Sequence, residues 1–356
     1  MIEISGMDNR ETEACAEVLG IEPYRARQVR HWIFKRLARG FDEMTSLPKD
    51  LRARLAGECR FSSLETADLQ ISRDTTRKVL FRLSDGFFIE SVLIPERDHW
   101  TLCISSQAGC AMGCRFCLTA RQGFHRNLSP AEIVDQVLEV KRSMDDPDQL
   151  TNLVLMGMGE PLANYENVKK AVGILTADEG LNFSHRKVTL STCGLVPVMR
   201  RLGREMTVNL AVSLNAADPE TRDFLMPVNR RYPLPELLAA CREFPLPNRR
   251  MITFEYILME GVNDSERDAE RLTSLLRGIR AKINLIPLNP HPESPFKPSS
   301  MERILQFQEV LIQRHYTAII RKSKGQDILA ACGQLSGQYE EHEARSGSGP
   351  DQVLQA

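Results

Sequence analysis

The sequence predicts an α/β fold in which alternating strands and helices follow a small helical unit and a β-meander. Residues 1–62 carry helical periodicity, residues 63–95 alternate apolar and polar side chains, and residues 96–335 alternate short apolar strands with amphipathic helices. Repeated β–α units with short connections imply parallel strands and right-handed crossovers, in either a barrel or a wound open sheet. About six such units are expected, fewer than the eight of a closed barrel.

The composition is that of a globular chain with a real core. Its 356 residues are 42% hydrophobic and 26% charged, enough for one large domain and an accessory one. The sequence has no long apolar run and no secretory leader, so we expect a cytoplasmic protein without a membrane span. A net charge of −1 excludes a globally basic nucleic-acid binder but leaves room for local basic patches.

Residues 1–62 are expected to form a helical accessory domain, with helices at 11–19 and 24–37 and a third that starts at Pro48. Between positions 25 and 39 this domain carries basic residues and no acidic one: Arg25, Arg27, Arg30, Lys35, Arg36 and Arg39. Such a run is typical of a solvated helix face, and it also fits contact with an RNA backbone. Both interpretations stay open.

Residues 63–95 are expected to form a β-meander extension. Apolar residues alternate on both sides of a hairpin signal at 84–86: Val79, Phe81, Leu83, Phe88, Ile89, Val92 and Ile94. The meander leads into Leu102-Cys103-Ile104, where the alternation of strands and helices begins.

A capping box with proline in the first turn, Ser129-Pro130-Ala131-Glu132, starts the first helix of the large domain. Further strands are expected at 152–156, 187–191, 207–214, 251–258, 282–287 and 317–322. Helices are expected at 166–175, 196–202, 233–241, 265–277 and 301–314. The polar tail, 336–356, is predicted to be disordered.

Three cysteines, Cys110, Cys114 and Cys117, stand at C-x₃-C-x₂-C spacing in a loop with Gly109 and Gly113. Such a loop can aim three thiolates at one centre, one ligand too few for a closed four-coordinate site. Zinc sites usually add a second cysteine or histidine pair, whereas three thiolates on an iron–sulfur cubane leave one iron open. The alternative is a non-catalytic RNA-binding protein with a structural zinc site.

Polar residues also occupy the ends of several predicted strands. One such segment is Met156-Gly157-Met158-Gly159-Glu160-Pro161, which lacks the third glycine of a dinucleotide fingerprint. Its small residues let a ligand approach the backbone, and Glu160 can accept a hydrogen bond from an ammonium group. Ser191 and Ser213-Leu214-Asn215 fall where barrel enzymes build their sites. Capping of the following helix is the other interpretation of these positions.

The segment Cys110-x₃-Cys114-x-Phe116-Cys117 resembles the signature of the radical S-adenosylmethionine (SAM) superfamily. The resemblance implies a partial (β/α)6 TIM-like barrel and a 4Fe–4S cluster held by the three cysteines. In that superfamily, SAM binds the open iron through its amino and carboxylate groups, and one electron cleaves SAM to a 5′-deoxyadenosyl radical. Gly159 and Glu160 resemble the Gly-Glu motif that holds the SAM amino group.

A more specific resemblance, to the RlmN/Cfr family of RNA adenosine methyltransferases, covers nearly the whole chain. It rests on the segments at 101–107, 122–128, 227–229, 289–290 and 321–335. It implies methylation of carbon 2 of an adenosine in 23S rRNA and of adenosine 37 in tRNA, with two SAM per methylation and a flavodoxin-type electron donor. The Cfr branch, which methylates carbon 8 and confers antibiotic resistance, is the alternative.

The same resemblance assigns catalytic roles to three residues. Cys332 matches the cysteine that first accepts a methyl group from SAM and then presents it to the adenine as a carbon radical. Glu90 matches the base that removes the proton as aromaticity returns. Cys103 matches the cysteine that resolves the covalent adduct through a transient disulfide with Cys332.

Further residues match contacts of the family to SAM: Asn289, Ser191, Ser213, Leu214 and Asn215. The family commonly has histidine at the position of Asn215 and often serine at that of Cys193. We also expect the basic residues Arg321, Lys322 and Lys324 to favour the thiolate of Cys332.

Overall fold

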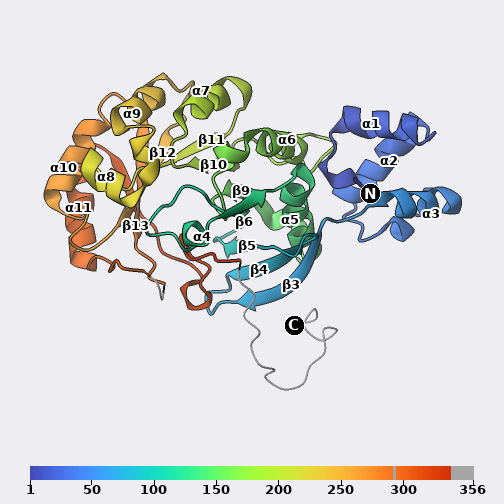
Figure 1. Ribbon diagram of the computed structural model, residues 1–356, viewed down its shortest axis with the longest axis horizontal. Helices are drawn as coiled ribbons and strands as arrows, with labels where there is room; N and C mark the ends of the chain where they lie inside the picture. Colours follow the sequence, from blue (N-terminus) through green and yellow to red (C-terminus); the bar gives the residue numbers. More distant parts are fainter. Residues whose placement is uncertain (292–293, 338–356) are drawn as a thin grey trace, which may run out of the picture.

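The computed structural model describes residues 1–291 and 294–337. It confirms the predicted fold class, a helical N-terminal unit followed by one large sheet with helices packed on it (Figure 1). The tail expected to be disordered lies, from position 338 onwards, outside the described residues. Among those residues, no helix combines the length and the apolar surface that a bilayer crossing requires.

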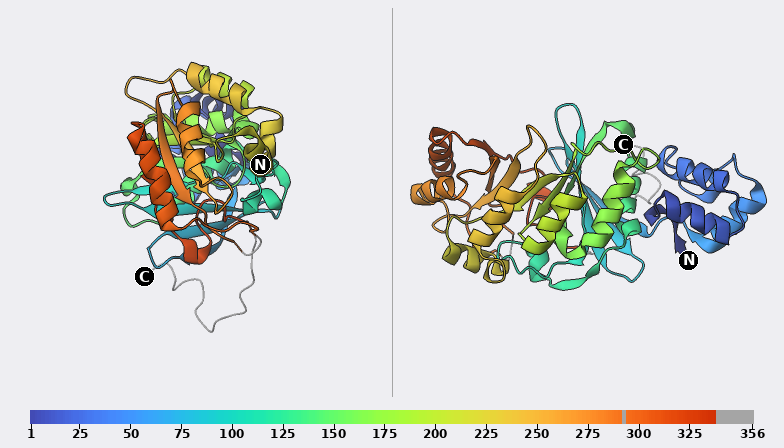
Figure 2. Two further views of the ribbon diagram at one scale, coloured as in Figure 1. Left: turned by 90° about the vertical axis from the view of Figure 1, so that its left-hand side faces the viewer. Right: turned by 90° about the horizontal axis from the view of Figure 1, so that it is seen from above.

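The N-terminal unit contains the three predicted helices and a small parallel sheet, and Figure 2 shows it at one end of the molecule. Its elements are β1 (Ile2–Glu3), α1 (Asn9–Val18), α2 (Pro23–Phe34), α3 (Lys49–Glu58) and β2 (Cys59–Arg60). A capping box between Asp8 and Glu11 starts α1. Helix α2 ends before the predicted position 37, because Leu37 adopts a positive φ of 52°.

The predicted meander is present and belongs to the large sheet. It consists of β3 (Leu64–Ile71), β4 (Arg77–Leu83) and β5 (Phe88–Pro95), which pair antiparallel, and β5 continues antiparallel to β6 (Trp100–Cys103). Phe81 and Ile89 are cross-strand partners, and both are fully buried. The same register places Leu80 opposite Glu90. The meander thus extends the sheet beyond the first parallel strand.

The rest of the sheet is parallel and open, in the order β14-β13-β12-β11-β10-β9-β6. After β6 its strands are β9 (Leu150–Leu155), β10 (Val188–Thr192), β11 (Asn209–Ser213), β12 (Ile252–Leu258), β13 (Ala281–Pro287) and β14 (Thr317–Ile320). The crossovers carry α5 (Pro130–Arg142), α6 (Tyr165–Thr176), α7 (Val196–Glu205), α8 (Pro219–Leu225), α9 (Leu234–Glu243), α10 (Glu266–Leu275) and α11 (Met301–Gln313). Every residue of β12 is buried, as expected for a parallel strand covered on both faces. The result is the partial barrel of six β–α units.

Three small elements frame the cysteine loop and were not predicted. Strand β7 (Gln107–Gly109) pairs with β8 (Phe124–Asn127), and α4 (Leu118–Arg121) follows the third cysteine. Gly109 has a φ of +73°, and a Cβ at this position would lie 2.0 Å from the carbonyl oxygen of Gly123. Only glycine fits this crossing of the two strands.

Candidate active site

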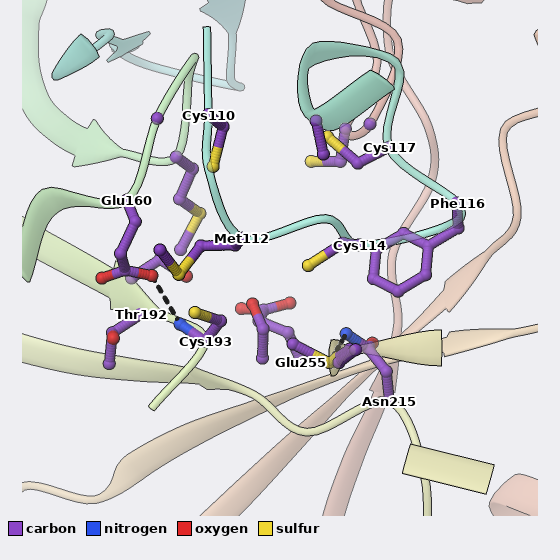
Figure 3. Close-up of a pocket in the computed structure, with 18 of the residues that line it drawn as sticks. Cys110, Met112, Cys114, Phe116, Cys117, Glu160, Thr192, Cys193, Asn215 and Glu255 are labelled. Atoms are coloured by element: carbon purple, nitrogen blue, oxygen red, sulfur yellow. Dashed lines mark hydrogen bonds between the residues drawn. The ribbon is translucent and has the colours of Figure 1, made fainter. Parts of the chain in front are cut away.

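One pocket lies at the carboxyl ends of the parallel strands and brings most of the predicted site residues together (Figure 3). The cysteine loop, the segment after β9, the ends of β10 to β12 and the loop after β14 contribute its walls. The predicted residues among its lining are Cys110, Cys114, Cys117, Gly159, Glu160, Ser191, Ser213, Asn215 and Cys332. The pocket therefore sits where barrel enzymes place their chemistry.

The three loop cysteines point their sulfur atoms into this pocket (Figure 3). Burial raises the pKa of each thiol, that of Cys110 to about 12, so a bound cation is needed to hold them as thiolates. Within the described residues, no three cysteine, histidine or acidic side chains are arranged to hold a single metal ion. Thiolates on a cubane bind different irons and stand farther apart than ligands of one ion. Three thiols on one loop match the three cysteine ligands of a cubane with one open iron.

Glu160 is held in place by backbone groups from two neighbouring segments. Its side chain, on a residue only 4% exposed, accepts hydrogen bonds from the amides of Leu162 (3.0 Å) and Cys193 (2.8 Å). Burial raises the pKa of this carboxyl group, and the two amides act in the opposite direction. The side chains of Thr192 and Cys193 also hydrogen-bond to this carboxylate, so an ammonium group would share it with them or replace one of them.

Gly159 lets the chain approach the cysteine loop closely. Its φ is +99°, and an added Cβ would lie 2.8 Å from the backbone nitrogen of Gln107. The side chain of Gln107 in turn accepts from the amide of Glu160 at 2.8 Å. The Gly-Glu segment is thus fixed directly beside the strand that leads into the cysteines.

The predicted residues at the strand ends divide into two groups. Ser191, Ser213 and Asn215 line the pocket, whereas Leu214 and Asn289 are not among the described residues that do. Leu214 is fully buried, since neighbouring residues at a strand end point to opposite sides. The Oδ1 atom of Asn215 is already engaged, because it accepts from the amide of Ile257 at 2.9 Å. The expected contacts of these residues to SAM stay predictions.

Cys332 reaches the pocket from the loop after β14. The residue is exposed by surface area and lines the pocket. Burial raises its pKa, Glu255 raises it further, and Arg321 acts in the opposite direction. Arg321 thus favours the thiolate as expected, but burial and Glu255 outweigh it, so the net shift of the Cys332 pKa is upward.

Cys103 ends β6 and lies behind the pocket wall. It is buried, and burial raises its pKa, with a further contribution from the nearby Cys332 thiol. All nine cysteines, each within the described residues, are free thiols. The expected disulfide between Cys103 and Cys332 is thus not formed in this structure, and as a transient bond it stays a prediction.

Glu90 lies outside the pocket lining, on β5. It is 2% exposed and forms an ion pair with Lys78, whose Nζ is 3.1 Å from Oε1. Its other oxygen accepts from the backbone amides of Ser336 (2.8 Å) and Gly337 (3.2 Å). The carboxylate therefore holds the chain segment that follows Cys332.

Arg222 on α8 is a site residue that no sequence motif indicated. It is fully buried, and its guanidinium donates to the carbonyl oxygens of Cys193 (2.8 Å), Leu214 (3.2 Å) and Ser213 (3.3 Å). It also donates to Oδ1 of Asn229 at 2.9 Å. Thr192, Cys193 and Glu255 line the pocket without having been predicted. Thr192 and Cys193 stand at the end of β10, whereas Glu255 lies in the middle of β12, where no sequence pattern marks it.

Comparisons with known proteins agree with this geometry. Residues 104–272 match the family model of the radical SAM superfamily, and residues 2–60 match that of the ribosomal RNA large subunit methyltransferase N-terminal domain. The dual-specificity RNA methyltransferase RlmN of Syntrophus aciditrophicus is 55% identical over 336 residues, which cover 94% of this chain and 97% of the relative. That of Geobacter sulfurreducens is 54% identical over 340 residues, covering 96% and 93%.

A solved structure, that of a radical SAM methyltransferase from Sphaerobacter thermophilus, superposes with a TM-score of 0.92 at 46% identity. The match covers 95% of this chain and all of the other, which confirms the fold over both the helical unit and the partial barrel. The chain belongs to the RlmN family of dual-specificity RNA methyltransferases, within the radical SAM superfamily.

Proposed function

We propose that this methyltransferase modifies carbon 2 of an adenosine in RNA and carries the methyl group on Cys332. The observation that supports this most directly is the shared pocket: Cys332 lies in the wall that also contains the cysteine loop and Glu160. A thiol in this position can take up a methyl group and present it to a base at the open end of the barrel. The electrophilic adenine carbon does not attack SAM by itself, so a carrier is needed.

Membership of the radical SAM superfamily implies a 4Fe–4S cluster and SAM, which supply an electron and a carbon radical when bound. Cys110, Cys114 and Cys117 would hold the cluster as thiolates. Glu160, oriented by the amides of Leu162 and Cys193, would receive the SAM amino group beside or in place of its side-chain partners Thr192 and Cys193. Ser191, Ser213, Leu214, Asn215 and Asn289 would complete the SAM contacts.

Cys332 must lose its proton before it accepts a methyl group. Arg321 is the cation that favours this step, against the burial of the thiol and the charge of Glu255. Glu90 would then take the proton that leaves the adenine ring. Cys103 would release the product: its thiolate would bond to the Cys332 sulfur as the bond from that sulfur to the methylene carbon breaks, and the methylene carbon would take up a proton to become the methyl group. The unpaired electron of the adduct would leave to a one-electron acceptor, a role that the redox chemistry of the cluster can supply. The nearness of the Cys103 and Cys332 thiols supports the role of Cys103.

The RNA targets that we propose are 23S rRNA and tRNA, which the dual-specificity name of the relatives supports. The target base must leave its stack to reach the pocket. Residues 1–62 would serve as the RNA-binding accessory domain, 63–95 as the extension and 96–335 as the catalytic domain. A flavodoxin-type donor would supply the electron.

The variant Cys332→Ala tests the carrier. It should keep the iron content, the broad absorption near roughly 400 nm of such clusters and the cleavage of SAM, but give no methylated RNA. Cys241→Ala, which removes a buried thiol on α9, is the matched control and should still methylate RNA. RNA methylation by Cys332→Ala would refute the carrier role.

Mass spectrometry of digested RNA from the unaltered enzyme tests the position of the methyl group. The expected product is 2-methyladenosine. The appearance of 8-methyladenosine instead would place the enzyme with the Cfr branch. A colourless protein that binds zinc and leaves SAM intact would refute the proposed chemistry altogether.

A further inference from the structure

Residues 325–337, here called the strap, carry Cys332 between two anchors of different kinds (Figure 1). The first anchor is the turn between β3 and β4. Asp327 of the strap accepts from the Ser72 hydroxyl (2.5 Å) and the Arg73 amide (3.1 Å), and Asp74 of the turn accepts from the Gly325 amide (3.1 Å). Carboxylates from both segments therefore fix the start of the strap.

Close packing reinforces this first anchor. Gly325 has a φ of +64°, and a Cβ at this position would lie 2.7 Å from the Ala330 side chain and 3.0 Å from that of Thr76. Thr76 is fully buried. The start of the strap cannot shift without moving the turn, so it is suited to act as a fixed pivot.

The second anchor is the carboxylate of Glu90. It accepts hydrogen bonds from the backbone amides of Ser336 and Gly337 at the end of the strap, while Lys78 holds its other oxygen. Between the two anchors the strap contacts the short helix α4, through Leu118 N–H to Gly333 C=O (2.8 Å) and Thr119 Oγ1 to Leu335 C=O (2.6 Å).

We propose that Glu90 and the end of the strap form a latch, so that the movement that carries Cys332 toward RNA also uncovers the Glu90 carboxylate. The proposal rests on the carrier and base roles assigned above. With the latch closed, two amides and the Lys78 ammonium occupy the carboxylate. When Ser336 and Gly337 leave, lone pairs on Oε2 become available to a proton, and Lys78 keeps the side chain in place.

The backbone conformation of the strap is compatible with a rotation of its later residues about the first anchor. Leu329, Gly333 and Gly337 adopt positive φ angles of 52°, 85° and 60°. Leucine is strained in this conformation, so the closed form is maintained by its contacts. The latch also sets the order of loading the methyl group on Cys332 and removing the proton from the adenine. Glu90 stays covered while Cys332 faces the pocket, and it is uncovered when Cys332 leaves the pocket.

Two variants at one position test the latch. Ser336→Pro removes the amide that donates to Glu90, and Ser336→Ala keeps it as the matched control. In anaerobic holoenzyme without SAM or RNA, hydrogen exchange of peptides from the strap should be about tenfold faster in Ser336→Pro than in Ser336→Ala, the ratio expected for one lost hydrogen bond to a charged group. Equal exchange in the two variants would overturn the proposal.

Carbodiimide coupling of glycinamide, read by peptide mass spectrometry, reports whether Glu90 is covered. Ser336→Pro should raise the labelling of Glu90 over Ser336→Ala and leave that of Glu96, outside the latch, unchanged. Unchanged Glu90 labelling in an opened strap would refute the coupling. Neither readout needs methyl transfer, so failure of the latch and failure of the proposed function give separate results.

In a third variant, Glu90→Gln, the strap should exchange as fast as in Ser336→Pro, because the charged acceptor is gone. Combining the two substitutions should add little, since both break the same contact. Slow exchange in Glu90→Gln, or fully additive effects, would show that Glu90 does not hold the strap.

Discussion

Arg222→Met is expected to destabilise the protein and, with it, the wall of the pocket. The guanidinium of Arg222 is fully buried and spans the ends of β10 and β11 through the carbonyls of Cys193, Ser213 and Leu214, with Asn229 as its fourth acceptor. Methionine has a similar length, so it fills most of the space without opening a large cavity. The substitution therefore tests the hydrogen bonds rather than the packing.

The magnitude follows from the four acceptors that lose their donor. A buried acceptor left without a partner costs about 1 kcal/mol or more, and removal of the buried charge returns some of its desolvation cost. We expect a net loss of about 4 kcal/mol in the free energy of unfolding. For an m-value of about 3 kcal/mol/M, the urea midpoint should fall by about 1.3 M.

The assay is urea unfolding of metal-free, reduced protein, followed by far-UV circular dichroism. The absence of the cluster ensures that its loss does not contribute to the transition. Arg267→Met, on the exposed surface of α10, is the control and should change stability by less than about 0.5 kcal/mol. A loss below about 1 kcal/mol in Arg222→Met would refute the assignment of Arg222 as the brace of the strand ends.

Three further predictions concern single contacts. Gly159→Ala, which forces a Cβ against the backbone of Gln107 at a φ of +99°, should weaken SAM binding at least about tenfold by calorimetry, whereas Gly173→Ala, with open space around it, should not. Burial raises the pKa of Asp135 to about 6, above its unfolded value of about 3.9, so ionisation of Asp135 opposes folding. The urea midpoint of the parent protein should therefore fall relative to that of Asp135→Asn as pH rises from about 4 to about 6. Partial burial alone would raise the pKa of Asp74, but hydrogen bonds from Thr76 and the Gly325 amide lower it to about 2. Its stabilisation is therefore present above about pH 4 and lost toward pH 2, and Asp74→Asn should flatten the fall in urea midpoint over this range.

The sequence predicted those parts of the molecule that depend on neighbouring residues. The strands and helices of the barrel follow from local periodicity, and the cysteine loop from a contiguous motif. Arg222 could not be found in this way, because arginine is rarely fully buried and its acceptors come from the ends of two other strands. The opposing contribution of Glu255 to the pKa of Cys332 escapes sequence analysis for the same reason, because Glu255 stands on β12, far away in sequence.

The contacts of Glu90 show how a single residue can be placed correctly in a strand while its partners stay beyond the reach of sequence analysis. Its position on β5 follows from the alternation of the meander, but its partners Ser336 and Gly337 lie 246 and 247 positions further along the chain. No periodicity connects such segments. Only the folded chain places the proposed base under the end of the strap that carries Cys332.

The cysteine loop and the strap also support each other. Helix α4 directly follows Cys117, and it is α4 that donates to the strap carbonyls of Gly333 and Leu335. A cluster bound by the loop would fix the start of α4 and thereby the middle of the strap. The position of Cys332 in the pocket would thus depend on a loaded cysteine loop as well as on Glu90, so that the carrier is held in place when the cluster that supplies the electron is present.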